Sequence, residues 1–169
     1  MQLNLKQTEK DLGIKILPWE TSLGLDCSTR TGWCKATTTD KIIDLEYGFI
    51  KFNVQDRLIM YEMFLKQFEK LIQPNMKLVI EESFLGTNPK VFQLLSRIGM
   101  IAFIVGRQKN IAIDRISFLT PSYSRKLLGF KGNDKKINIH KQFLKQTKLQ
   151  LTDPDIIDGI ILSLCGLKI

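Results

Sequence analysis

Four acidic residues of this sequence stand where their carboxylates can act together. Asp26 and Glu81 each follow a short apolar run of the kind that forms a buried strand. Asp155 and Asp158 are three residues apart in a segment with helical periodicity, so their side chains share one helix face. If the two strands are neighbours and the helix packs across their carboxyl ends, all four carboxylates converge on one site.

Such a cluster carries several negative charges at short range, and divalent cations relieve the repulsion between them. Mg²⁺ and Mn²⁺ prefer oxygen ligands of this kind. Two ions in one site suit phosphodiester cleavage, because one helps to deprotonate the attacking water and the other stabilises the leaving 3′-oxygen. The acids therefore predict a site for two Mg²⁺ ions, with Mn²⁺ as a possible substitute.

Each acid also has an explanation that involves no chemistry. Asp155 and Asp158 stabilise a helix simply by lying in its first turns, near the positive end of the helix dipole. Asp26 alone suits the start of a turn, and Glu81 with its neighbour Glu82 suits a solvated strand end. The four together are more specific than any one of them, because four separate coincidences would be needed.

Hydrophobic periodicity predicts the elements that position these acids. Residues 23–25, 33–39 and 42–52 have the pattern of three consecutive antiparallel strands, and 77–80 and 111–118 that of two more. The expected fold is therefore α/β, with a mixed five-stranded sheet whose first three strands are antiparallel. Apolar residues at steps of three and four, or helix-start signals, predict the flanking helices at 56–72, 90–107, 123–128, 134–147 and from 153 onward.

Length and composition predict one folded domain, residues 22–169, after an N-terminal extension, residues 1–21. The 25 Lys and Arg residues exceed the 17 Asp and Glu residues, and the net charge of +8 indicates a nucleic-acid partner before a membrane. Three cysteines without a metal-binding or disulfide pattern indicate reduced thiols inside a cell. No stretch approaches about 18 consecutive apolar residues, so we expect no membrane partner.

The sequence resembles the RuvC-type Holliday junction resolvases of the RNase H-like superfamily, including viral or phage-type members. The resemblance covers residues 23–167 and consists of four motifs in order. An Asp precedes small residues and a Gly, a strand ends in Glu with an aromatic residue three positions later, a loop carries glycines and lysines, and a final helix contains a DxxD pattern. These motifs lie at residues 23–33, 79–84, 129–136 and 155–163.

The resemblance implies that the four acids are catalytic metal ligands and that Phe84 reaches the strand-exchange point, where it stacks on bases. It implies that Lys135 contacts the phosphate beside the scissile bond. Basic residues with a looser assignment to DNA binding are Arg125, Lys126, Lys131 and Lys136. It further implies a homodimer that makes paired nicks, with residues 90–107 in the dimer surface, and no small-molecule cofactor. The expected location is cytoplasmic or nucleoid-associated, in a host cell if the protein is viral.

The sequence departs from the family pattern at three places. Glu82 adds an acid where the family often has a neutral residue, the loop around Lys131 is one residue longer, and residues 1–21 have no counterpart. The only histidine, His140, falls in the basic helix, and an exposed or partner-stabilised structural role is favoured over catalysis.

The predicted function is a metal-dependent, structure-selective endonuclease that resolves Holliday junctions or other branched DNA. Two alternatives stay open: a non-catalytic DNA-junction-binding protein, and an RNase H-type nuclease on RNA–DNA hybrids. A sugar-kinase or actin-like ATPase opens with a similar strand, Asp and turn, but it needs a second such domain, and 169 residues hold only one.

Overall fold

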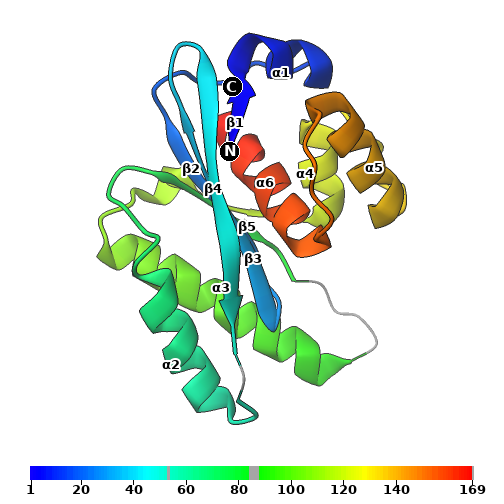
Figure 1. Ribbon diagram of the computed structural model, residues 1–169. Coiled ribbons are helices and arrows are strands. Elements are labelled where there is room, and N and C mark those ends of the chain that lie inside the picture. The colour runs from blue at the N-terminus through cyan, green and yellow to red at the C-terminus, as the bar shows by residue number, and fades with distance from the viewer. Residues whose placement is uncertain (53, 84–87, 169) are drawn as a thin grey trace.

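A six-stranded mixed sheet lies between two layers of helices in the computed structural model, which describes residues 1–52, 54–83 and 88–168 (Figure 1). The strands lie in the order β1-β4-β3-β2-β5-β6. Their bounds are β1 Gln2–Asn4, β2 Thr21–Asp26, β3 Arg30–Thr38, β4 Ile42–Lys51, β5 Lys77–Glu81 and β6 Ile116–Leu119. The helices are α1 Leu5–Leu12, α2 Arg57–Phe68, α3 Pro89–Gln108, α4 Pro121–Leu127, α5 Lys136–Thr147 and α6 Pro154–Leu167, with a 3₁₀ turn at Ile113–Arg115.

The predicted α/β fold is confirmed. β2, β3 and β4 form the expected antiparallel meander, and β5 and β6 continue the sheet in parallel with β2. The predicted count of five strands is corrected to six, because β1 pairs with β4 and places Leu3 opposite Ile43. β6 is shorter than the strand predicted for residues 111–118, because the 3₁₀ turn occupies the start of that stretch.

The two helical layers enclose separate parts of the core. α2 and α3 cover the face of the sheet that carries Leu23, Leu25 and Ile80. α6 lies across the other face with α1, α4 and α5 beside it (Figure 1). The N-terminal segment belongs to this second layer, since Leu5 and Leu12 of α1 are buried in the same cluster as residues of α5 and α6.

Helix α6 approaches the sheet closely because glycines lie beneath it. A Cβ atom at Gly24 of β2 would overlap the backbone of Gly159 and Ser163, and one at Gly32 of β3 would overlap the backbone of Asp155. The absence of side chains at these two strand positions lets the first turns of α6 lie directly on β2 and β3. The small residues around Asp26 therefore determine where the acids of α6 lie.

Helix α3 is the longest helix of the described chain, and its two sides differ. Its length and composition would allow it to cross a membrane, but the core helix of a folded domain has the same length and composition. Its inner side packs into the core through Ile98, Ala102 and Val105. Its outer side leaves Met100 50% and Ile104 46% exposed.

Candidate active site

Two of the predicted acids lie at the carboxyl ends of neighbouring strands. β2 and β5 pair in parallel with Leu25 opposite Ile80, so Asp26 and Glu81, the next residues, leave the sheet at the same edge. Asp26 is only 6% exposed, whereas Glu81 is half-buried. Parallel strands bring their carboxyl ends together at one edge of a sheet, and such an edge is a common place for functional side chains.

Helix α6 contributes the third acid of this group. Asp153 caps its N-terminus by accepting hydrogen bonds from the backbone N–H groups of Asp155 and Ile156, and Pro154 occupies the first turn. One turn further, Asp158 is buried against the sheet. The cap fixes where α6 begins, and the glycines let it approach the sheet closely, so together they position Asp158 over the end of β2.

The three carboxyl groups affect one another's ionisation. Burial, followed by repulsion from Asp158, raises the pKa of Asp26 from 3.8 to about 7. Burial, followed by repulsion from Asp26 and Asp158, raises the pKa of Glu81 from 4.5 to about 8. Such large upward shifts mean that ionising all three groups together is unfavourable without a compensating cation.

Lys136, the first residue of α5, supplies part of that compensation. Its ammonium group forms an ion pair with Asp158, and its Nζ lies 3.8 Å from Oδ2 of Asp26. Burial lowers the pKa of this lysine, but the charges of Asp158, Asp26 and Glu81 outweigh burial and raise the pKa above its ordinary value. Among the lysines predicted for DNA binding, Lys136 is thus the one with ion pairs to the acids in the described chain.

His140 lies one helical turn after Lys136 and also contacts Asp158. Its Nε2 donates a hydrogen bond of 2.7 Å to Oδ1 of Asp158, and both side chains are buried. Burial acts to raise the pKa of Asp158, but the bonds and charges of His140 and Lys136 hold it below its ordinary value. From the sequence, a structural role was favoured for His140; its four-residue spacing from Lys136 was the available signal that both share one helix face.

Asp155 lies at the border of the group and has a different partner. Its Oδ2 is 3.4 Å from Nη1 of Arg30, whose Nη2 also binds Asp153 at 2.5 Å. The guanidinium of Arg30 lies over the ring of Phe49, 3.7 Å from the ring centre. Asp155 raises the pKa of Asp26 less than burial and Asp158 do, so its influence on the acidic group is weaker. Arg30 was not predicted as a site residue.

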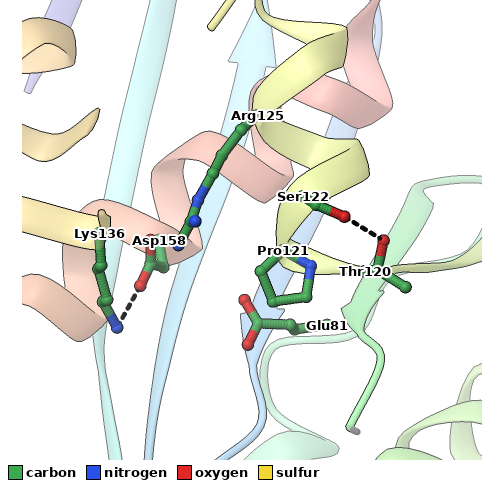
Figure 2. A pocket seen from close by; sticks show the side chains of 7 residues that line it. All are labelled: Glu81, Thr120, Pro121, Ser122, Arg125, Lys136 and Asp158. Carbon is green, nitrogen blue, oxygen red and sulfur yellow. Dashed lines mark hydrogen bonds and ion pairs between the residues drawn. The ribbon is translucent and has the colours of Figure 1, made fainter. Parts of the chain in front are cut away.

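A cavity of about 610 Å³ opens beside Glu81, Lys136 and Asp158 (Figure 2). Its other wall is the start of α4, with Thr120, Pro121, Ser122 and Arg125. Arg125, one of the predicted DNA-binding residues, points across this cavity in Figure 2. The same side chain donates a hydrogen bond from Nη1 to the carbonyl of Asp134, which holds it against the loop before α5.

The other predicted DNA-binding residues lie outside this cavity. Lys126, Lys131 and Lys135 are exposed on α4 and on the loop that leads into α5. Glu82 is exposed as well, one residue after Glu81. Phe84 lies outside the residues that the structure describes.

The donor chemistry of the site fits the predicted divalent cations. In the described ranges, no three Asp, Glu, His or Cys side chains stand close enough together to hold one ion as they are oriented. Asp26, Glu81 and Asp158 nevertheless offer carboxylate oxygens that are buried or half-buried. The raised pKa values of Asp26 and Glu81 and the ion pair of Asp158 indicate that the group favours a nearby positive charge. These three residues are the ones that would hold a hard cation, with Asp155 next to them.

Comparison with known proteins gives a likeness in structure alone. No protein-family model matches the chain, and no curated protein matches it in sequence. RuvC of Thermus thermophilus is similar in structure with a TM-score of 0.71 and 11% identity, over 88% of this chain and 98% of that one. T. thermophilus RuvC in complex with a Holliday junction substrate is similar with a TM-score of 0.72 and 11% identity, over 86% and 92%. The expected resemblance is confirmed in the fold: this chain has the RNase H-like fold of RuvC.

Proposed function

We propose that this protein is a structure-selective endonuclease that resolves four-way DNA junctions by metal-dependent hydrolysis of phosphodiester bonds. The observation that carries the proposal is the group formed by Asp26, Glu81 and Asp158 at one edge of the sheet, with pKa values of about 7 and 8 for the first two. The RuvC fold supports the choice of a branched-DNA substrate, because the similar protein was solved with a Holliday junction.

Each residue has a distinct part in the proposed reaction. Asp26, Glu81 and Asp158, with Asp155 beside them, would hold Mg²⁺ or Mn²⁺, which supplies an activated water and stabilises the leaving oxygen. His140 orients Asp158 through its hydrogen bond. Lys136, together with Arg125 across the cavity, offers positive charge to the phosphate that enters beside the acids. Lys136 would then exchange part of its contact with Asp158 for a contact with DNA.

We further propose that the protein acts as a homodimer, because two symmetric nicks on one junction call for two active sites. The outer side of α3 supports this surface, since Met100 and Ile104 expose apolar area there, and Phe118 of the edge strand β6, whose ring lies near that of Phe103 in α3, is also exposed. All three cysteines have free thiols, which supports a reducing, intracellular location.

A second candidate function is a DNA-junction binder without cleavage activity. The observation that favours it is the pairing of the acids with cations of the chain itself. Lys136 pairs with Asp158, and Arg30 pairs with Asp155. In a protein that only binds DNA, these ion pairs would stabilise the fold, and the exposed basic residues would bind the DNA.

Cleavage of a labelled four-way junction in Mg²⁺ or Mn²⁺ separates these functions. We expect paired symmetric nicks from the wild type, loss of cutting but retained binding in Asp26→Asn, and unchanged cutting in Asp40→Asn, whose carboxylate is exposed in a turn. Binding without cutting by the wild type would identify the junction binder. Preferred cutting of an RNA–DNA hybrid would identify the RNase H-type nuclease, and equal cutting by Asp26→Asn would remove Asp26 from the active site.

A further inference from the structure

The positive charge of the chain is concentrated in two segments that pack together. Residues 5–15 and 131–148 contain nine lysines and three acids, and they therefore supply six of the eight net positive charges. The first segment contains α1, and the second contains the glycine-lysine loop and α5. α1 packs against α5 in the layer that also holds α6 (Figure 1). This concentration calls for an explanation beyond the single lysine at the acids.

The outer side of α5 carries a row of lysines. Lys141 and Lys145 lie one turn apart, and Lys148 follows at the next turn, while Ile139 and Phe143 of the same helix are buried. These three lysines are exposed, and none forms an ion pair with a described residue. The row spans about 10 Å from Lys141 to Lys148, at about 1.5 Å per residue, and Lys136, which meets the acids, lies one to two turns before it.

Helix α1 packs against α5 and carries exposed lysines of its own. Leu5 and Leu12 anchor it in the core beside α5, and Asn4 caps its start by accepting a hydrogen bond from the backbone of Gln7. Figure 1 shows α1 beside the C-terminal end of α5, away from the acidic site. The segment is thus held in a fixed position relative to the lysine row.

Lysines surround a hollow beside α1. Lys6, Lys10 and Lys15 line it together with Lys168, and Glu9 is the acid among its lining residues. The Glu9 carboxylate accepts a hydrogen bond of 2.9 Å from the backbone N–H of Ile16, so it is directed to the chain and pairs with none of these lysines. Among the described residues, the three lysines of the N-terminal segment have no acidic partner.

We propose that α1 and α5 form one surface that binds the sugar-phosphate backbone of a duplex arm of the DNA substrate. The proposal rests on the proposed function for its choice of DNA, and it assigns the N-terminal segment a role in binding. Lysine ammonium groups contact phosphates as point charges, without reading bases, so this binding is independent of sequence. A row of about 10 Å spans about three base pairs of a duplex.

The dependence of DNA binding on salt tests the surface directly. The triple variant Lys6→Gln, Lys10→Gln and Lys15→Gln removes three exposed charges and leaves Leu5 and Leu12 in place. Affinity for a four-way junction is measured in EDTA, so that nothing is cut, from low to high salt. The slope of log K against log salt is negative, and each lost phosphate contact reduces its magnitude by about 0.9. Three lost contacts therefore reduce it by about 2.7. Between 50 and 200 mM salt, the affinity advantage of the wild type then shrinks by about 40-fold.

A matched control changes the same charge on the other helical layer. Lys66→Gln, Lys70→Gln and Lys109→Gln remove three exposed lysines from the ends of α2 and α3. We expect this variant to keep the wild-type slope. If the magnitude of the slope decreases equally in both triple variants, or in neither, the proposed surface is overturned.

Two further substrates separate this inference from the proposed function. We expect the N-terminal triple variant to lose affinity for a 30-base-pair linear duplex in the same way, and a loss confined to single strands would overturn the duplex assignment. If the wild type cuts junctions while the slopes do not differ, the surface is wrong and the nuclease stands. If the wild type shows no preference for junctions and cuts none, the nuclease is wrong, and a lower slope of the variant on duplex still supports the surface.

Discussion

Replacing Asp26 by Asn is expected to make the folded protein more stable at neutral and alkaline pH when divalent metal is removed. Asp26 is nearly inaccessible to solvent, and burial, together with the charge of Asp158, raises its pKa from 3.8 to about 7. The unfolded chain loses this proton near pH 4, whereas the folded protein holds it until about pH 7. The free energy of unfolding of the wild type therefore falls as pH rises through this window, and the Asn variant lacks this fall.

The size of the effect follows from the shift. A difference of about three pKa units corresponds to about 4 kcal/mol at about 1.4 kcal/mol per unit, and this is the ceiling. The repulsion is shared with Glu81, and the variant also loses the attraction between Asp26 and Lys136, so we expect about 1–3 kcal/mol at pH 8.5. For a domain of this size, each 1 kcal/mol raises the melting temperature by about 2–4 °C.

Urea unfolding at pH 5 and pH 8.5 in EDTA measures this difference, with Asp40→Asn as the control for the same change at an exposed position. We expect Asp26→Asn to gain stability over the wild type mainly at pH 8.5 and Asp40→Asn to follow the wild type at both pH values. Adding Mg²⁺ is expected to stabilise the wild type and to reduce the difference in its free energy of unfolding from that of Asp26→Asn. A variant that is less stable than the wild type at both pH values would refute the electrostatic reasoning.

Substitutions at His140 and on the outer side of α3 test metal binding and dimer formation. His140→Ala is expected to weaken Mn²⁺ binding, measured by calorimetry, by about 10- to 100-fold, because it releases Asp158; His140→Gln, which can keep a donor at this position, is expected to recover most of the affinity. Met100→Asp combined with Ile104→Asp is expected to convert a dimer to a monomer in sedimentation experiments, whereas Lys109→Asp at the end of the same helix is expected to leave it dimeric.

The strands that carry the site were predictable because their signals are local. The apolar runs before Asp26 and Glu81 are short, end in acids and are followed by loops, and the structure has β2 and β5 there. The final helix was marked by Asp153 and Pro154, an N-cap and a first-turn residue whose roles the structure confirms. Local capping and periodicity thus located the elements, whereas the pairing of β2 with β5 was only a condition of the predicted site, and the structure shows it.

The N-terminal segment could not be placed in the same way. β1 has three residues, too few for a periodic signal, and its position depends on pairing with β4, about 40 residues later. In α1, Leu5, Thr8 and Leu12 are buried at spacings of three and four, but polar residues between them obscured this pattern. Such a segment is specified by the surface that it covers, and the sequence alone does not show that surface.

The partners of the acids were also out of reach of sequence reasoning. His140 meets Asp158 across 18 positions, and Arg30 meets Asp155 across 125. These pairs depend on how α5 and β3 are placed beside α6. A sequence pattern names the acids because they end strands or share a helix turn, but it contains no signal for a cation that arrives from another element.

Helix α5 connects the acidic site with the basic surface. Its inner side directs Lys136 and His140 to the two carboxylate oxygens of Asp158, while its outer side exposes Lys141 and Lys145 to solvent. A phosphate backbone bound along the outer side would therefore hold the same helix that orients Asp158. Because Lys136 and His140 contact the acids from the same helix that carries the lysine row, a displacement of α5 would alter substrate binding and the geometry of Asp158 together. In the proposed nuclease, α5 is the element through which binding of a DNA arm and assembly of the active site depend on each other.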